Sequence, residues 1–414
     1  MTLTSRLPEP LQIRDYGLLW LTTLLTGFAL QMVAVAVGWQ VYAIHRSAFD
    51  LGLIGLAEFV PLPLLALPAG QIADHVSRRL VILVSCFLDL ATVSLLLVVT
   101  IAGAHSLWPF LVLAAATGVS TAVGAPGLRA IAPLLVPADL LPSAMALRSV
   151  AFQAATVLGP ALGGLLFAID DVSVYAAAIV LLVVSIGCAF ALRVPPVGEP
   201  SEPLGIASLT AGVRFIRRTE VLLGAISLDL FAVLFGGAVA LLPLFARSIL
   251  HVGPFGLGVL RAAPALGAIL AGIVLTRRPL GGNAGKTLLV VVAIFGASMI
   301  VFGLSRSFPL SLAALAVSGF VDMFSMNIRG TTVALATPDA LRGRVMAVEM
   351  VFISASNELG AFESGLAAAL IGAVPAVVAG GALTIGLAAV WPIFFPALAS
   401  IDRLEELKPA EGAL

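Results

Sequence analysis

Charged side chains are scarce in this chain. Asp, Glu, Lys and Arg make up 11% of its 414 residues, whereas about a quarter of a soluble globular domain is charged. Apolar residues make up 60% of the sequence. Water therefore cannot be the main solvent around this protein, and a soluble globular fold is excluded.

Cysteine and histidine are also rare, which argues against several kinds of chemistry. Cys86 and Cys188 fall inside apolar segments, which favours packing roles over a disulfide framework. The four histidines lack the spacing of metal ligands, and the chain has no Gly-x-x-x-x-Gly-Lys-Ser/Thr loop for nucleotide phosphates. We therefore expect neither an enzyme activity nor a metal or organic cofactor, and no direct use of ATP unless a separate subunit supplies it.

Long apolar segments dominate the sequence instead. A helix needs about 20 apolar residues to cross the hydrocarbon core of a bilayer, and twelve segments reach that scale. They lie near residues 16–42, 50–72, 80–101, 107–133, 143–168, 172–193, 220–246, 254–276, 287–304, 308–333, 344–369 and 374–397. The sequence therefore predicts an all-α polytopic membrane protein with 12 transmembrane helices.

The positive charges are unevenly distributed between the loops. If the N-terminus is cytoplasmic, most of the 22 Lys and Arg residues lie on the inner side, and the exceptions are Arg46, Arg247, Arg306 and the intramembrane Arg261. Cytoplasmic loops of membrane proteins are enriched in Lys and Arg, so we expect both termini in the cytoplasm. The net charge of zero hides this sidedness and gives no indication of a nucleic-acid partner.

The chain divides into two similar halves. A polar linker at 194–219 separates an expected six-helix bundle at 1–193 from a second at 220–398, and a cytoplasmic tail follows at 399–414. Within the linker, 206–218 is expected to form a short amphipathic helix with a basic end on the inner membrane surface. Matching residues recur at an offset near 200, among them Gly118 and Gly319, Arg129 and Arg329, Asp139 and Asp339, and Gly164 and Gly365. Two pseudo-symmetric bundles can rock to open a central cavity to each side in turn.

The loop between the second and third segments carries a pattern of glycine, aspartate and two arginines. Gly70, Asp74, Arg78 and Arg79 are spaced as in the inner loop of the major facilitator superfamily, which the chain resembles. A glycine permits close helix approach, and the charged groups can hold the two bundles together while the inner gate is shut. The matching loop of the second half lacks the aspartate, so this latch is expected on one side only.

The fifth segment contains a Gly-Pro-x-x-Gly-Gly element formed by Gly159, Pro160, Gly163 and Gly164. This element is similar to one in the antiporter branch of the superfamily. The proline kinks the helix, and the glycines let a neighbouring helix pack closely.

Two further stretches indicate a particular group within the superfamily. Arg14-Asp15-Tyr16 near the start and the residues from Gly212 to Arg218 resemble the enterobactin-exporter and macrolide-efflux group of bacterial facilitators. The resemblance implies a monomeric carrier in the bacterial inner membrane that exports a siderophore or a drug-like amphiphile from the cytoplasm. It also implies that the proton gradient supplies the energy.

Ionisable residues inside spans are energetically costly, and each is a candidate for function. The resemblance places Asp229 and Asp322 beside the cavity, and Glu358 and Glu363 on a gating helix. These four carboxylates are the candidates for proton coupling, although each could also be a satisfied interhelical hydrogen-bond partner. Glu58 and Arg261 are candidates for an outer pair. Glu349, near an inner helix end, is expected to pair with Arg129, Arg148 or Arg344.

The substrate cavity is expected to combine polar side chains with flexible or flat apolar ones. The candidates are Gln31, Gln40, Gln153, Phe231, Phe235, Arg261, Met323, Met326, Asn327, Asn357 and Phe362. Carboxylates suit a cationic substrate, whereas an arginine with aromatic neighbours suits an anionic one, so the sign of the substrate charge stays open. The alternative functions are a sugar or metabolite uniporter or symporter, a lipid flippase, and a membrane scaffold or sensor without transport.

Overall fold

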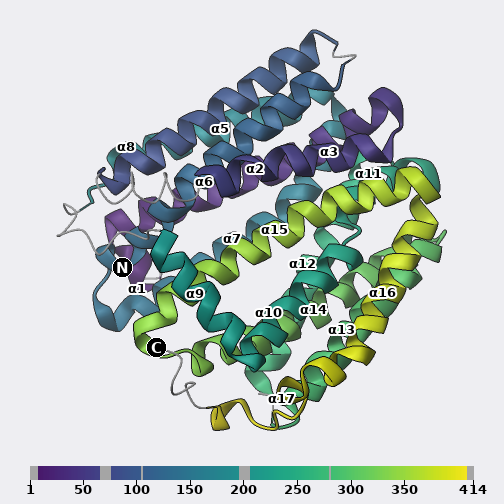
Figure 1. Ribbon diagram of the computed structural model, residues 1–414. Coiled ribbons are helices and arrows are strands. Elements are labelled where there is room, and N and C mark those ends of the chain that lie inside the picture. Colours follow the sequence, from purple (N-terminus) through teal and green to yellow (C-terminus); the bar gives the residue numbers. More distant parts are fainter. Residues whose placement is uncertain (1–7, 66–75, 104–105, 195–205, 279–280, 408–414) are drawn as a thin grey trace. The chain divides into compact units, whose positions relative to one another are not determined.

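The computed structural model describes residues 8–65, 76–103, 106–194, 206–278 and 281–407. Throughout these ranges the secondary structure is helical (Figure 1). Eleven helices are long and apolar enough to cross a membrane. A further helix, α6 (Trp108–Leu135), has a shorter apolar portion at Trp108–Gly124. The all-helical membrane protein expected from the sequence is thus confirmed.

The described chain forms two compact units. Unit 1 comprises Met1–His45, Ala57–Pro203 and Gly253–Ala262, and unit 2 comprises Arg46–Leu56, Leu204–Val252 and Ala263–Leu414. Each unit therefore includes one short segment from the other half of the chain. These segments are the start of α3 (Ala48–Phe59) in unit 2 and the start of α12 (Gly253–Arg277) in unit 1.

Unit 1 is built around α2 (Arg14–His45), which packs against α7 (Leu141–Ile169) and α8 (Asp171–Ala191). α5 (Arg78–Ile101) packs against α6 and α8. Short helices at Glu9–Gln12 (α1) and Ala138–Leu140 (η2) precede α2 and α7.

The Arg14-Asp15-Tyr16 stretch fastens the beginning of α2 to its neighbours. The hydroxyl of Tyr16, which is 2% exposed, donates a hydrogen bond to the carbonyl of Ala144 on α7. The Asp15 carboxylate accepts a hydrogen bond from the backbone N–H of Arg193, just after α8, over 3.0 Å. This stretch therefore has a structural role, because it connects three helices at one end of unit 1.

The Gly-Pro-x-x-Gly-Gly element of α7 is a packing surface within unit 1. A Cβ atom on Gly159 would lie 2.7 Å from Cβ of Gln31, and one on Gly163 would lie 2.6 Å from Cα of Met32, both on α2. A Cβ atom on Gly164 would lie 3.1 Å from Cα of Phe255 on α12. The first two distances are shorter than real Cβ contacts and the third is tighter than most, so these glycines allow the close approach of α2 and α12 to α7.

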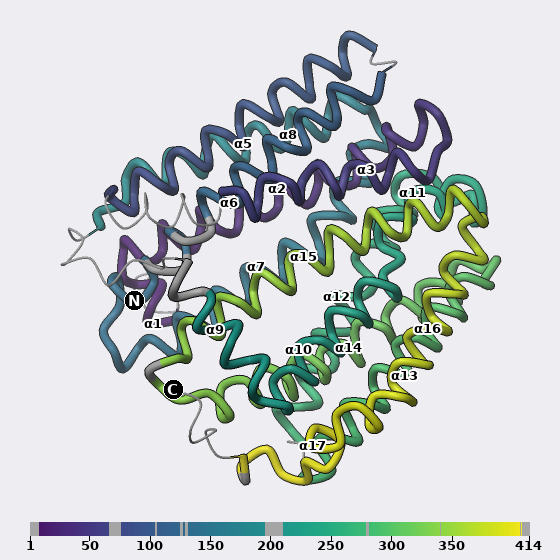
Figure 2. The backbone as a smooth tube through the Cα atoms, in the orientation of Figure 1, coloured from purple at the N-terminus to yellow at the C-terminus, as the bar shows by residue number. Residues whose placement is uncertain are grey.

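Unit 2 contains the linker helix α9 (Ile206–Arg218) and the long helices that follow it. They are α10 (Glu220–Gly236), the remainder of α12, α13 (Ala284–Leu304), α14 (Phe308–Ala336), α15 (Asp339–Ile371) and α16 (Ala373–Phe394). α13 runs beside α14 and α16, whereas α10 packs against α15 and α16 (Figure 2). The tail contributes α17 (Pro396–Ala399) and a short turn, η5 (Leu404–Glu406).

The helix that begins with α10 is interrupted rather than continuous. After Gly236 the chain forms a 3-10 turn at Val239–Leu241 (η3), the short α11 (Leu242–Leu244) and a π-helical turn at Phe245–Ile249 (η4). The Ser364 hydroxyl of α15 donates a hydrogen bond of 2.6 Å to the carbonyl of Gly237 in the break. The Ser364 hydroxyl thus supplies a hydrogen-bond donor for a carbonyl that lies outside the regular helix.

The contact between α2 and α7 gives a stability prediction. Gly163→Leu places a side chain into the backbone of α2, so we expect a lower thermal unfolding midpoint in detergent, with a loss of about 1–3 kcal/mol or more. Gly187→Leu on α8 is the matched control, because a Cβ atom there meets nothing within 4 Å. Equal midpoints for the two variants would show that α2 and α7 are not packed through Gly163.

Candidate functional site: a buried arginine between carboxylates

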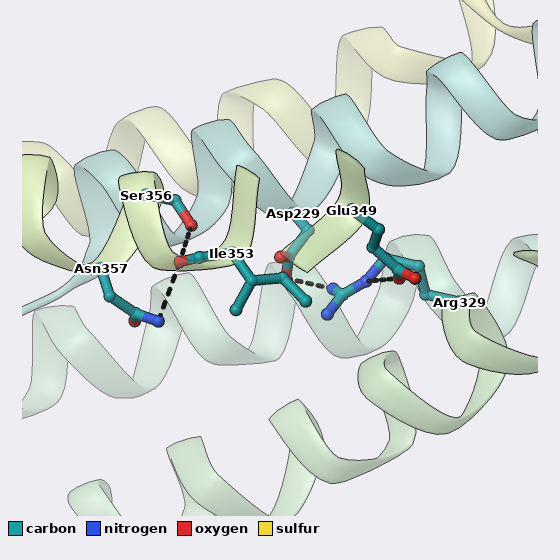
Figure 3. A network of polar contacts seen from close by, with 6 residues as sticks. All are labelled: Asp229, Arg329, Glu349, Ile353, Ser356 and Asn357. Carbon is teal, nitrogen blue, oxygen red and sulfur yellow. Dashed lines mark hydrogen bonds and ion pairs between the residues drawn. The ribbon is translucent and has the colours of Figure 1, made fainter. Parts of the chain in front are cut away.

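The most prominent polar cluster of unit 2 has a buried arginine at its centre. Arg329 lies in the last third of α14, and the residue is 4% exposed. Its guanidinium forms an ion pair with Asp229 of α10, and its Nε atom lies 3.8 Å from a carboxylate oxygen of Glu349 on α15 (Figure 3). Electrostatic interactions of the Arg329 side chain therefore link α14 to α10 and α15.

Asp322 belongs to the same cluster. It lies seven residues before Arg329 on α14, about two helical turns, which places both residues on one side of the helix. Asp229, Asp322 and Ser325 line a small cavity between α10, α13 and α14, whose other walls are formed by valines and Phe295. The cavity offers about 10 Å³ to water centres, which is room for roughly one water molecule.

The charges of this cluster do not balance. Asp229, Asp322 and Glu349 can carry three negative charges, whereas Arg329 supplies one positive charge. Burying unpaired charges away from water costs several kcal/mol each. The cluster is therefore a place where bound protons or a cationic group would lower the electrostatic free energy.

About two turns after Glu349, α15 carries two side chains that bond to their own helix. The Ser356 hydroxyl and the Asn357 amide both donate to the carbonyl of Ile353, over 2.9 and 3.0 Å (Figure 3). Such bonds compete with the backbone pattern and often bend a helix. Asn357, a cavity candidate, is thus exposed but engaged within α15.

The two other coupling candidates lie further along α15. Glu363 lines a second small cavity beside the break of α10, next to Ser364. Glu358 lies close to the start of α3, because a Cβ atom on Gly55 would be 3.6 Å from its Oε2 atom. Neither residue belongs to the Arg329 cluster. Of the four candidates for proton coupling, Asp229 and Asp322 therefore lie together, whereas Glu358 and Glu363 lie elsewhere in unit 2.

The aromatic cavity candidates of α10 form part of an aromatic stack. The rings of Phe231 and Phe235 are stacked with centroids 6.2 Å apart, and Phe231 meets Trp391 of α16 edge-on at 6.2 Å. Trp391 continues the stack to Phe395 at 5.0 Å. These ring contacts pack α10 against α16.

The remaining cavity candidates of unit 2 differ in exposure. Met323 and Phe362 are half-buried, and the Phe362 ring lies 6.1 Å from that of Phe49 on α3. Met326 is 50% exposed, and Asn327 is also exposed. Both exposed residues are on α14, where Met326 is three residues and Asn327 two residues before the buried Arg329.

The glutamine candidates lie in unit 1. The Gln31 amide faces Thr156 at 3.5 Å, and Gln153 is half-buried on α7. Gln40 accepts a hydrogen bond of 2.6 Å from the buried Tyr175 hydroxyl and also contacts Thr100. Gln40 lines a cavity of about 390 Å³ at the end of α2, together with Ala43, Ile44, His45, Thr100, Gly103, Phe110 and Asp171.

Part of the inner-loop pattern lies outside the described residues, namely Gly70 and Asp74. Arg78 begins α5, and the guanidinium of Arg79 donates to the carbonyl of Phe190 on α8 while lying 6.0 Å from the centre of its ring. Glu58 and Arg261, expected as an outer pair, both belong to unit 1.

Sequence reasoning overlooked Arg329 as a site residue. The charge pattern of the sequence counts Arg329 among the residues on the inner side, and it predicts Arg129, Arg148 or Arg344 as the partner of Glu349. The structure places Nε of Arg329 3.8 Å from a carboxylate oxygen of Glu349, a partner that was not among those expected. The seven-residue spacing between Asp322 and Arg329 is the signal that indicates a shared face on one helix.

The buried ion pair gives a second stability prediction. Arg329→Gln leaves the carboxylates without their counter-charge, so we expect a loss of roughly 3–5 kcal/mol in unfolding free energy. Arg342→Gln is the control, because Arg342 pairs with Asp339 on the surface, where the side chains are 47% and 89% exposed, and such pairs contribute about 1 kcal/mol or less. Equal unfolding free energies of the two variants in detergent would contradict a structural role for the cluster.

Comparison with known proteins agrees with the helical architecture. Residues 5–411 match the family model of the major facilitator class described as transmembrane secretion effector. Among solved structures, a POT family transporter in complex with 5-aminolevulinic acid superimposes with a TM-score of 0.73 over 93% of this chain and 96% of its own, at 12% identity. The human organic anion transporter MFSD10 gives a TM-score of 0.67 over 93% of this chain and 100% of its own, at 17% identity. These structures establish the likeness in fold.

Several curated relatives are efflux proteins. The multidrug efflux pump Tap of Mycolicibacterium fortuitum is 27% identical over 89% of this chain and 92% of its own. The macrolide efflux protein A of Streptococcus pyogenes is 24% identical over 90% and 93%, and the enterobactin exporter EntS of Shigella boydii is 28% identical over 92% and 91%. The chain therefore belongs to the transmembrane secretion effector family of major facilitator transporters, which are membrane carriers and not enzymes.

Proposed function

We propose that this protein is a proton-coupled antiporter that exports an amphipathic small molecule from the bacterial cytoplasm. The observation that carries the proposal is the buried cluster of Asp229, Asp322 and Glu349 around Arg329. A carrier driven by protons needs acidic groups whose proton occupancy changes with their surroundings. The excess of carboxylates over arginines in this cluster meets that need.

The geometry suggests how a proton could act on the helices. Arg329 is paired closely with Asp229 and more loosely, at 3.8 Å, with Glu349. A proton bound by Asp229 removes the negative charge of that carboxylate, so the guanidinium then interacts with Glu349 and Asp322 alone. Because Asp229 is on α10 and Glu349 on α15, the change in pairing alters the attraction between α14 and each of these helices.

The substrate class is inferred from the relatives. Their names include a multidrug pump, a macrolide efflux protein and an enterobactin exporter. Macrolides and siderophores are both compact molecules with apolar and polar surfaces, so we propose a siderophore or a drug-like amphiphile as substrate. The proton gradient is the proposed energy source, without a further cofactor.

The proposed transport cycle is alternating access by two six-helix bundles with 12 spans in total. Eleven described helices suited to crossing a membrane, together with α6, support this count. The proposed orientation has both termini in the cytoplasm, because Lys and Arg concentrate in the loops that this places inside. We propose a monomer as the working unit.

Transport in inside-out vesicles tests the coupling. Vesicles energised to be acid inside are expected to accumulate a macrolide, a catecholate siderophore or a cationic dye through the native protein. Asp229→Asn and Asp322→Asn are expected to reduce uptake to its level without a gradient while leaving substrate binding intact, because neither amide can carry the exchanged proton. Asp339→Asn, at an exposed pair, is the control and is expected to transport normally.

The other outcomes distinguish the alternatives. Uptake that ignores the pH gradient would identify a uniporter or a carrier driven by another ion. Normal gradient-driven uptake by both variants would place the coupling elsewhere, with Glu358 and Glu363 as the next candidates. Movement of phospholipid alone would identify a flippase, and the absence of any transport or binding would favour a scaffold.

A further inference from the structure

The linker helix α9 has two opposite faces with different surroundings. Phe215 and Ile216 are 2% and 4% exposed, whereas Arg214, Arg217 and Arg218 are exposed. The three arginines are spaced by three and four residues, which puts them on one side of the helix. We call this side the basic face.

The apolar side of α9 is occupied by protein. Phe215 and Ile216 belong to a core cluster with residues of α10, α14 and α15, namely Leu222, Ile226, Val333, Ala336, Leu341, Val345 and Val348. A Cβ atom on Gly212 would lie 2.9 Å from the carbonyl oxygen of Arg344, so α9 touches the backbone of α15. The side of α9 that carries Phe215 and Ile216 therefore does not dip into lipid, as the apolar side of an isolated interfacial helix would, whereas the basic face is exposed.

The basic face has no counter-charge of its own. α9 contains no acidic residue. Within the described ranges of the chain, Arg214, Arg217 and Arg218 form no ion pair or hydrogen bond with protein. Three cationic side chains on one side of a helix attract acceptors that carry several phosphate oxygens.

The position of α9 indicates where those acceptors come from. Its core partners are in the first two turns of α10, the first three turns of α15 and the last turn of α14, so α9 lies near one end of each of three membrane-suited helices. The ends of spanning helices are at the depth of the lipid headgroups. Anionic phospholipids attract basic residues at this depth by about 1 kcal/mol for each Lys or Arg.

We propose that the basic face of α9 binds the headgroups of anionic phospholipids, and that this contact holds α9 on the ends of α10, α14 and α15. The core beneath α9 is adjacent to the Arg329 cluster: Ile226 precedes Asp229 by three residues, Val333 follows Arg329 by four, and Val348 precedes Glu349. Lipid binding therefore steadies the helix ends next to the segments that carry the three charged groups.

Hydrogen–deuterium exchange of the full-length protein in nanodiscs tests this directly, without knowledge of the transported substrate. Amides of 206–218 and of the first turns of α15 are expected to exchange more slowly in discs of phosphatidylcholine with phosphatidylglycerol than in discs of phosphatidylcholine alone. The double variant Arg217→Gln with Arg218→Gln removes two positive charges. It is expected to reduce the difference in exchange rate between the two kinds of disc by about tenfold or more.

Matched variants make the result specific. Arg277→Gln with Arg278→Gln removes the same charge at the end of α12, where both arginines are also exposed, and is expected to keep the full protection of α9. Arg217→Lys with Arg218→Lys keeps the charge and is also expected to keep the protection. Thermal unfolding midpoints in detergent check that all variants are folded.

Four results would overturn the proposal. They are equal exchange of the native protein in both kinds of disc, loss of protection in the lysine variant, equal loss in the glutamine variants of α9 and α12, and full protection by glycerol phosphate added to phosphatidylcholine discs. The last result would identify a site for a free phosphate ester instead of a lipid surface. None of these exchange measurements depends on transport. A negative result for lipid binding would therefore leave the proton-coupling proposal untouched.

Discussion

The ion pair between Arg329 and Asp229 is the constraint on which unit 2 depends. A guanidinium that is nearly inaccessible to water is stable only with a counter-charge beside it. The helices α10, α14 and α15 must therefore stay close enough for their charged groups to interact. The apolar core that contains Phe215, Leu222 and Val345 packs these three helices together next to the cluster. The same requirement makes the cluster sensitive to protons, because any change in the charge of a carboxylate changes the partners available to Arg329.

Both units contain close glycine contacts between helices, and unit 2 adds a buried charge cluster. In unit 1, glycines of α7 bring backbones together, and Tyr16 and Asp15 bond across helix ends. In unit 2, Gly319 and Gly380 make similar close contacts with backbone, and the Arg329 cluster and the aromatic contacts of Trp391 add to them. A glycine contact is set by shape alone, whereas a charge cluster responds to protonation.

Much of the helical pattern could be predicted from the sequence, because long apolar segments have few alternatives in a membrane. The helix at 206–218 was also predictable from its alternation of apolar and basic residues, and α9 has the same bounds. Asp229 and Asp322 stood out because charges inside spans are costly. The role of Arg329 was missed because position along a chain does not give depth, and an arginine near a helix end looks like an ordinary loop charge. The neighbours of Phe231 and of the apolar side of α9 depend on tertiary packing, which composition does not specify.

A double-mutant cycle on Asp229 and Arg329 tests the central claim most directly. The unfolding free energies of Asp229→Asn, Arg329→Gln and the double variant would be compared by reversible denaturant titration in detergent micelles. We predict that the double variant is less destabilised than the sum of the single variants by at least about 1 kcal/mol, because removing both groups leaves one fewer unpaired charge. Additive effects of the two substitutions would contradict the account, because they would mean that Arg329 and Asp229 do not stabilise each other.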